Sequence, residues 1–169
     1  MIHKKVCLLG DFAVGKTSLV RRFVDRQFSD AYLSTVGVKI SRKSISPPNG
    51  VETQLVLWDI EGSTRFKEIT PSYLEGAHCA VVVADLSRRE SVDHVHEHIE
   101  RFLGINPGTP CVLALNKADL EGTVPVADFP PAGSDTRITT VTLTSAKTGV
   151  GVDDMFMALA RALSPRTPA

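Results

Sequence analysis

The chain has 169 residues, 43% hydrophobic and 22% charged, a composition typical of one soluble globular domain with its own core. Its formal net charge is +0, so bulk electrostatics give no reason to expect nucleic acid or an anionic membrane as a partner. No apolar run approaches the length of a membrane span, and the N-terminus leads into a strand rather than a signal peptide.

The first half of the chain reads as a strand, a helix and a hairpin. Apolar residues predict a strand over residues 2–9, and their helical spacing predicts a helix over 16–26. A polar loop over 27–38 follows. Alternating residues on both sides of a Pro-Pro-Asn-Gly turn predict a hairpin over 38–58.

The second half alternates strands with helices. Continuous apolar or β-branched runs predict buried strands at 77–84, 111–115 and 138–144. The segment Ser87-Arg88-Arg89-Glu90 has the form of a capping box, and an apolar stripe predicts a helix from there to about residue 103. A last helix is predicted over 151–163, with Asp153 and Asp154 near its positive end.

This order predicts an α/β fold, a doubly wound, mostly parallel sheet with helices on both faces. We expect one domain over 1–164 and a short flexible tail over 165–169, with no repeat or linker. Three prolines within 124–133 predict a loop or a single turn there. The three cysteines, Cys7, Cys79 and Cys111, each lie in an apolar run, which favours buried free thiols in a reducing compartment over disulfides.

The turn between the first strand and the first helix has the phosphate-binding pattern Gly-(four residues)-Gly-Lys-Thr at residues 10–17. Its glycines let backbone N–H groups surround a phosphate, and the helix start adds unpaired donors and the positive end of its dipole. Lys16 can reach terminal phosphates, and the Thr17 hydroxyl can bind Mg²⁺. The alternative, a chance glycine-rich turn, is disfavoured by the strand before it and the helix after it.

A second motif, Asp59-Ile60-Glu61-Gly62, directly follows the predicted strand that ends at Trp58. An acid at a strand end opposite a P-loop can hold Mg²⁺, and Gly62 can offer a backbone N–H to a terminal phosphate. Without the P-loop, the same residues would read as a helix N-cap followed by a flexible glycine.

The segment Asn116-Lys117-Ala118-Asp119 follows a strand and has the chemistry of base recognition. The Asp119 carboxylate can accept two hydrogen bonds, from N1–H and the exocyclic amine of guanine. Adenine lacks both donors, and leaving a buried acid unpaired discriminates on the order of 10⁴-fold in favourable sites. Asn116 can brace the loop, and the stem of Lys117 can lie along the base.

The last motif, Ser145-Ala146-Lys147, closes a further strand and can supply an N–H to the guanine oxygen. Each tetrapeptide alone is a common surface loop. All four motifs stand in this order and at strand ends, so they favour one nucleotide site.

Together these motifs resemble the Ras superfamily of small GTPases, most of all its Rab branch, over roughly residues 4–164. The resemblance implies a Ras-like G domain of the P-loop NTPase class. It also implies GTP or GDP with Mg²⁺ as cofactors. The implied nucleotide contacts are Asp11, Phe12, Ala13, Val14, Gly15, Lys16, Thr17, Ser18, Phe28, Thr35, Asp59, Gly62, Asn116, Lys117, Asp119, Ser145, Ala146 and Lys147. Thr17 and Thr35 would coordinate Mg²⁺, with Asp59 acting through water.

For catalysis the resemblance implies Lys16 on the β- and γ-phosphates, and Thr35 and Gly62 as γ-phosphate sensors. The chain departs from the family where Glu61-Gly62-Ser63 replaces Ala-Gly-Gln. Ser63 is too short to orient water as that Gln does, and a carboxylate at Glu61 would oppose the triphosphate by like charge. We therefore expect slow GTP hydrolysis that needs an activating partner. Glu61 positioning the water instead is a lesser possibility.

Three functions remain open at this point. The first is a GTP-dependent switch, and the second is a guanine-nucleotide-binding interaction module with little or no hydrolysis. The third, a P-loop ATPase or kinase, is opposed by residues 116–119. Effectors, exchange factors and GTPase-activating proteins are expected to bind through residues 30–45 and 58–75. In Rab proteins the positions of Trp58 and Tyr73 form an effector-reading surface together with a Phe, which is Ile40 here. Lys39 replaces an acidic residue that is common in Rab proteins at this position.

We expect a cytoplasmic monomer without a transmembrane segment. The last residues hold no cysteine and thus no prenylation site, so either the protein is not lipid-anchored or the tail was trimmed. His94 and His98 share a helix face, where a solvated surface is favoured over a metal pair because no further ligand is evident. The arginines of the first helix, Arg21, Arg22 and Arg26, are expected to face solvent, and Arg26 is a possible partner contact.

Overall fold

The computed structural model describes residues 1–31, 35–48, 50–62, 69–123, 125 and 135–165. Over these residues the sheet has six strands, in the order β2-β3-β1-β4-β5-β6. Their bounds are β1 (Ile2–Leu9), β2 (Val38–Ile45), β3 (Thr53–Ile60), β4 (Cys79–Asp85), β5 (Cys111–Asn116) and β6 (Ile138–Leu143). All neighbouring pairs are parallel except β2 and β3, which form the predicted hairpin.

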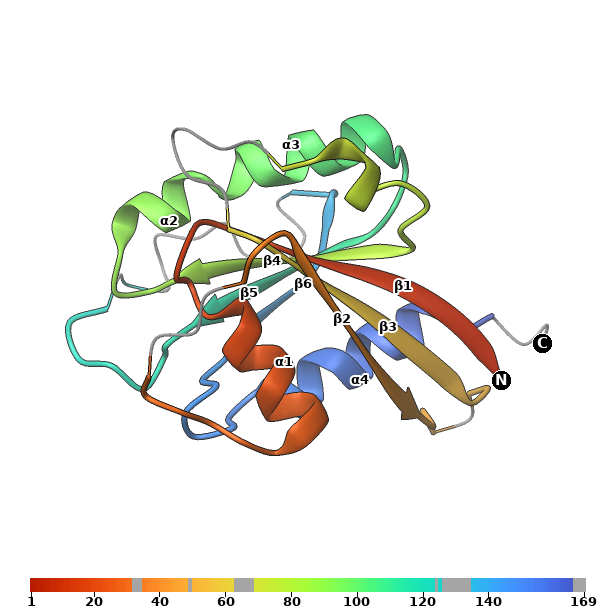
Figure 1. Ribbon diagram of the computed structural model, residues 1–169, viewed down its shortest axis with the longest axis horizontal. Coiled ribbons are helices and arrows are strands. Elements are labelled where there is room, and N and C mark those ends of the chain that lie inside the picture. Colours follow the sequence, from red (N-terminus) through yellow and green to blue (C-terminus); the bar gives the residue numbers. More distant parts are fainter. Residues whose placement is uncertain (32–34, 49, 63–68, 124, 126–134, 166–169) are drawn as a thin grey trace.

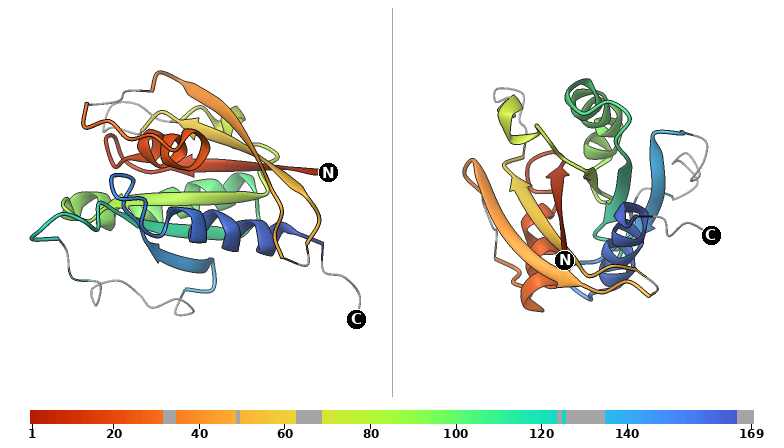
Figure 2. Two further views of the ribbon diagram at one scale, coloured as in Figure 1. Left: turned by 90° about the horizontal axis from the view of Figure 1, so that it is seen from below. Right: turned by 90° about the vertical axis from the view of Figure 1, so that its right-hand side faces the viewer.

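The helices cover both faces of this sheet. Their bounds are α1 (Lys16–Asp25), α2 (Arg89–Asp93), α3 (Val95–Ile105) and α4 (Val152–Leu163), with a 3-10 turn η1 (Pro71–Tyr73). Helices α1 and α4 lie on one face and α2 and α3 on the other (Figure 1), and two further views show the same three layers (Figure 2). The predicted α/β fold is confirmed.

Each face of the sheet has its own hydrophobic core. All seven residues of β4 are buried, as the continuous apolar run predicts for a central parallel strand. Under α1 and α4, the rings of Phe23 and Phe156 stack with centroids 4.1 Å apart. On the opposite face Phe102 of α3 is fully buried. These two layers hold the ends of the parallel strands, and therefore the loops that follow them, in fixed positions.

The cysteines are buried and free, as predicted. In the described parts of the chain, none of the helices combines the length and the apolar character needed to cross a membrane. The proline-rich segment lies outside the described residues except for Pro125, so its prediction stays untested, as does that for the tail beyond Pro165.

The helix predicted from residue 87 to residue 103 is wrong in its first turns. Helix α2 begins at Arg89 without a side-chain cap, and the axis breaks at His94, where α3 follows. The Ser87 hydroxyl donates instead to Oδ1 of Asp85 at 2.6 Å. The carboxylate at the end of β4 is within reach of this hydroxyl, so the capping box does not form.

Candidate functional site

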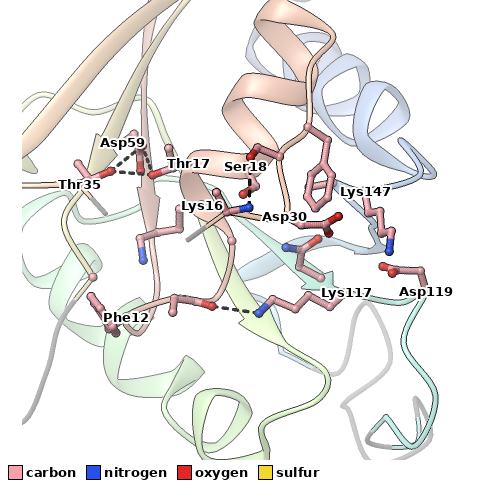
Figure 3. A pocket seen from close by; sticks show the side chains of 18 of the residues that line it. Phe12, Lys16, Thr17, Ser18, Asp30, Thr35, Asp59, Lys117, Asp119 and Lys147 are labelled. Atoms are coloured by element: carbon pink, nitrogen blue, oxygen red, sulfur yellow. Dashed lines mark hydrogen bonds between the residues drawn. The ribbon is translucent and has the colours of Figure 1, made fainter. Parts of the chain in front are cut away.

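The predicted motifs meet in one pocket of about 350 Å³ at the carboxyl ends of the parallel strands, where α/β sheets bind their ligands. Figure 3 shows Thr17, Thr35 and Asp59 gathered at one end, and Lys117, Asp119 and Lys147 at the other. Its wall consists of Phe12, Ala13, Gly15, Lys16, Thr17, Ser18, Phe28, Ser29, Asp30, Ala31, Thr35, Asp59, Ile60, Gly62, Asn116, Lys117, Asp119, Leu120, Ala146 and Lys147.

The glycine-rich loop opens helix α1 in the way an anion site requires. Gly15 is the N-cap with φ 103°, and the helix has neither a side-chain cap nor an acidic residue in its first turn. A side chain at Gly15 is also impossible on steric grounds, because its Cβ would lie 2.3 Å from Nδ2 of Asn116. The first N–H groups of α1 therefore remain for a ligand, and a phosphate satisfies both them and the helix dipole.

The carbonyls of the same loop are tied down one after another by side chains from elsewhere in the chain. Lys16 Nζ donates to the carbonyl oxygens of Gly10 at 3.0 Å and of Asp11 at 2.9 Å. The next three carbonyls also accept hydrogen bonds: that of Phe12 from Arg88 (2.5 Å), that of Ala13 from Lys117 (3.2 Å) and that of Val14 from Asn116 (3.0 Å). With its carbonyls engaged on one side, the loop keeps a fixed shape for its N–H groups on the other.

Lys16 itself is 6% exposed. Burial lowers the pKa of its ammonium to about 8, although the carboxylates of Asp59 and Asp11 oppose this effect. A cation held in a poorly hydrated place gains strongly from an anionic ligand. Its position at the loop matches the role predicted for phosphate binding.

Three oxygen-bearing side chains converge at the phosphate end of the pocket. The hydroxyl oxygens of Thr17 and Thr35 lie 2.7 Å apart. Both hydroxyls donate to Oδ2 of Asp59, at 2.7 Å and 3.3 Å. Asp59 is 1% exposed, and burial raises its pKa against the opposing hydrogen bonds.

The other oxygen of Asp59, Oδ1, is buried without a hydrogen-bond partner among the described residues. A buried carboxylate oxygen of this kind needs a cation or a donor. Two hydroxyls and a carboxylate are hard oxygen ligands, the set that Mg²⁺ takes beside phosphates. The residues present therefore fit a magnesium ion.

The segment after β3 packs directly on the glycine-rich loop. A Cβ on Gly62 would lie 2.6 Å from Cα of Phe12, so only glycine allows this approach. Glu61 is tied to the start of β2, because its N–H donates to the Gly37 carbonyl at 2.8 Å and its Oε2 accepts from the Gly37 N–H at 3.1 Å. The carboxylate expected near the γ-phosphate is thus bonded to the backbone two residues after Thr35. Ser63 lies outside the described residues.

At the opposite end, Asp119 is exposed to the pocket and held from behind. The Ser145 hydroxyl donates to its Oδ1 at 2.7 Å. Asn116 is 1% exposed and braces two loops, donating to Val14 and accepting from the Thr144 hydroxyl at 3.1 Å. Lys117 Nζ lies 2.8 Å from Oδ2 of Asp85, at the end of the neighbouring strand. These contacts leave the carboxylate of Asp119 as the polar group that a base would meet.

Arg22 does not face solvent as predicted. Its Nε donates to the carbonyl of Ala146 at 2.7 Å, and its Nη2 donates to the carbonyl of Lys147. Arg26 is exposed as predicted and pairs with Asp153 of the same chain at 2.6 Å, and its contact with a partner stays a prediction. Because α1 and α4 pack side by side, a helix face that would otherwise be solvated lies against the loop after β6 instead.

The prediction of a solvated histidine face is also wrong. His98 is 4% exposed, and both His94 and His98 contact the carboxylate of Asp11. No cluster of three or more metal-ligating side chains occurs among the residues described, so the metal alternative is not supported.

Of the predicted nucleotide contacts in the described segments, three have side chains away from the pocket wall. Asp11 turns to α3, Val14 is fully buried in the core, and the Ser145 hydroxyl serves Asp119. Sequence reasoning missed five residues that line the pocket, namely Ser29, Asp30, Ala31, Ile60 and Leu120. They lie in the loop after Phe28, between Asp59 and Gly62, and directly after Asp119, and this closeness to recognised positions was the available signal.

The sequence matches the profile of the Ras family over residues 5–165. The chain belongs to the Ras family. This small GTPase is 36% identical to the GTP-binding protein ypt5 of Schizosaccharomyces pombe, over 96% of its own length and 78% of that protein. It is 35% identical to the Ras-related protein Rab-1C of Dictyostelium discoideum, over 97% and 82% of the two chains. The GTP-binding protein YPTM2 of Zea mays is 35% identical over 96% and 80%. These relatives place the GTPase in the Rab branch.

Proposed function

We propose that this GTPase is a molecular switch that binds GTP and GDP with Mg²⁺ and hydrolyses GTP slowly. One observation carries the proposal: a single cleft joins a preformed phosphate loop, with a buried lysine, to a carboxylate held by a serine at the far end. The distance between these ends is bridged by one continuous pocket, as a nucleoside polyphosphate requires.

In this proposal each end of the cleft has its own task. The N–H groups of residues 13–18 and the ammonium of Lys16 bind the phosphates. Asp119 accepts from the guanine N1–H and amine, while the rings and chains of Phe28 and Lys117 flank the base. Thr17 and Thr35 would hold Mg²⁺ with Asp59, and bound Mg²⁺ would neutralise charge on the β- and γ-phosphates.

Hydrolysis would be slow because Ser63 replaces the residue that orients the attacking water. We expect an intrinsic rate at or below the order of 10⁻⁴ s⁻¹, with an arginine from an activating partner raising it by about 10³–10⁵. Partners would bind through residues 30–45 and 58–75. On this surface Ile40 stands opposite Trp58 in the β2–β3 ladder. A cytoplasmic monomer remains part of the proposal.

Calorimetry of GDP and ADP binding tests the site. We expect GDP to bind far more tightly than ADP, and Asp119→Asn to weaken GDP binding because one of two acceptors becomes a donor facing a donor. Equal binding of GDP and ADP, or binding of neither, would overturn the proposal.

Single-turnover hydrolysis of GTP tests the chemistry separately. Ser63→Gln is expected to raise the intrinsic rate. A wild-type rate well above 10⁻⁴ s⁻¹ contradicts slow turnover, whereas GTP that persists even with candidate activating proteins favours the alternative, an interaction module with little or no hydrolysis. The Glu61 carboxylate, bonded to the Gly37 N–H two residues after Thr35, is the specific feature that favours this second function.

A further inference from the structure

The phosphate-binding loop is anchored by its own acid to a pair of histidines on helix α3. Oδ2 of Asp11 lies 2.6 Å from Nδ1 of His94, and Oδ1 of Asp11 lies 2.8 Å from Nε2 of His98. The side chain of Asp11 is 16% exposed, that of His94 is 34% exposed and that of His98 is 4% exposed. Each carboxylate oxygen therefore has one imidazole partner, more than 80 residues away in the sequence.

The chemistry fixes which nitrogens carry hydrogen. A carboxylate only accepts, so Nδ1 of His94 and Nε2 of His98 must be donors. The remaining nitrogen of His98, Nδ1, is buried with no partner in the described segments. His94 is the more exposed of the two rings, and it is the one that can take up a proton at low cost.

The charges around His94 favour that proton. The hydrogen bond to Asp11 raises the pKa of His94, burial opposes this rise, and the carboxylates of Asp11, Glu97 and Glu90 raise the pKa further. Burial acts to raise the pKa of Asp11, but the hydrogen bonds from His98 and His94 outweigh it and hold that pKa low. Among the described residues, the cationic side chains that donate to carbonyls of the loop are Lys16, Arg88 at the start of α2, and Lys117.

We propose that Asp11, His94 and His98 form a clamp that positions the phosphate-binding loop and makes its grip on guanine nucleotide depend on a proton at His94. This inference rests on the proposed function only in taking GDP as the ligand. The three residues are positioning residues, since none of their side chains lines the pocket.

The clamp reaches the phosphates through Asp11 itself. Its carboxylate is held by α3 while its carbonyl accepts from Lys16 Nζ at 2.9 Å. Holding the side chain therefore fixes the backbone that orients the ammonium. Protonation of His94 turns its hydrogen bond to the Asp11 carboxylate into an ion pair, which strengthens the contact by Coulomb attraction. Protonated His94 also adds positive charge behind the loop, so both effects favour bound phosphate at lower pH.

The sign follows from the raised pKa of His94. The contribution of the charged bond is complete at low pH and is lost as the pH rises through the pKa of His94 in the folded protein. GDP release should therefore accelerate through this residue as the pH rises from about 6.5, the ordinary pKa of histidine, upward.

The test measures release of GDP carrying a fluorescent N-methylanthraniloyl group, chased with excess GDP at saturating Mg²⁺, across pH values from about 6 upward. Asparagine places an amide N–H near the position of the histidine Nδ1 but does not titrate. The rate of GDP release from His94→Asn should therefore lack the pH dependence that comes from His94. His94→Ala should release it about three- to tenfold faster than wild type at pH 6, and the difference should narrow without closing at high pH, where neutral His94 still donates to Asp11.

His96 supplies the matched control. It lies on the same helix, is 56% exposed, and contacts Arg137 and Asp135 rather than the loop. His96→Asn should keep the wild-type profile. A second pair tests the buried ring: His98→Gln retains a donor near the Nε2 position and should rescue the fast release seen in His98→Ala.

The outcomes separate the two claims. If wild type binds GDP tightly and His94→Asn, His94→Ala and wild type share one pH profile, the clamp is overturned while the proposed function stands. The clamp is likewise overturned if His98→Ala is folded, as judged by its thermal unfolding, and His98→Gln releases GDP as fast as His98→Ala does. If wild type binds no GDP at any pH, the proposed function itself fails.

Discussion

Ser145 holds Asp119 by a hydrogen bond of 2.7 Å from its Oγ to Oδ1, although its own side chain does not line the pocket. Removing the hydroxyl in Ser145→Ala would free the carboxylate to rotate away from the base. We expect GDP affinity to fall about ten- to a hundredfold, the value of one hydrogen bond to a charged group. Calorimetry with Ser164→Ala as a control checks this, since Ser164 bonds the Ala160 carbonyl at the end of α4. Equal losses in the two variants would contradict the role of Ser145.

Arg22 supports the loop after β6 with two hydrogen bonds, to the carbonyls of Ala146 and Lys147. A lysine in its place keeps the charge but cannot span both acceptors from one planar group. We expect Arg22→Lys to speed GDP release about three- to tenfold, measured by fluorescence. Among the described residues, the Arg21 side chain on the same helix donates to Gln27 at 3.4 Å and to no loop carbonyl, so Arg21→Lys should release GDP as wild type does. Identical rates for both variants would show that the two carbonyl contacts do not matter.

Glu61 has two separable properties, its charge and its bond to Gly37. Glu61→Gln keeps an oxygen acceptor for the Gly37 N–H but removes the charge, whereas Glu61→Ala removes both. If like charge opposes the γ-phosphate, both variants should raise the ratio of GTP to GDP affinity by about tenfold or less. A ratio that changes only in Glu61→Ala would assign the effect to the hydrogen bond. Competition binding with a non-hydrolysable GTP analogue measures the ratio.

Thr17 and Asp59 form the centre of the proposed magnesium site. Mg²⁺ is expected to slow GDP release from the wild type. In Thr17→Ala one oxygen ligand of the ion is lost, so we expect this slowing to be smaller by a factor on the order of ten or more. The measurement is the release rate over a Mg²⁺ titration, with release in excess chelator as the baseline. Thr139→Ala, which removes a hydroxyl bonded to the Cys111 carbonyl at the other end of β5, is the control. An unchanged Mg²⁺ dependence in Thr17→Ala would contradict the assignment.

Phe156 anchors the core between α4 and α1 through its stack on Phe23. Phe156→Ala should lower the free energy of unfolding by about 3–5 kcal/mol, because it removes a fully buried ring and leaves a cavity. Denaturant unfolding checks this against Val150→Ala, whose side chain is 62% exposed and which should change stability by about 0.5 kcal/mol or less. A loss below about 1 kcal/mol would mean that the neighbouring side chains fill the space.

The strands, the outer helices and the pocket could be predicted because their signals are local. A buried parallel strand such as β4 is a continuous apolar run, and the residues that follow such strands meet at one edge of the sheet. Asn116 and Asp119 could therefore be brought to the P-loop from spacing alone. The break at His94 could not, because the apolar stripe continues through it from α2 to α3.

The supporting residues could not be found in this way. His94, His98 and Arg22 all stand at helical positions that a polar surface also occupies, and their partners are more than 80 residues away. Side-chain periodicity gives the angle of a residue around its own helix axis. It gives no distance to a loop from another part of the chain, so a buried histidine and a solvated one look alike.

Cys7, Cys79 and Cys111 are at most 1% exposed. Burial raises the pKa of the Cys7 and Cys111 thiols to about 11, and it raises that of Cys79 further. The thiolate, the form of cysteine that reacts with alkylating reagents, is therefore scarce at neutral pH, and reagents cannot reach the buried sulfur atoms. A cysteine introduced on the surface could therefore be labelled selectively with a maleimide dye in the otherwise native sequence. Such a labelled protein would allow this GTPase to be studied by single-molecule spectroscopy.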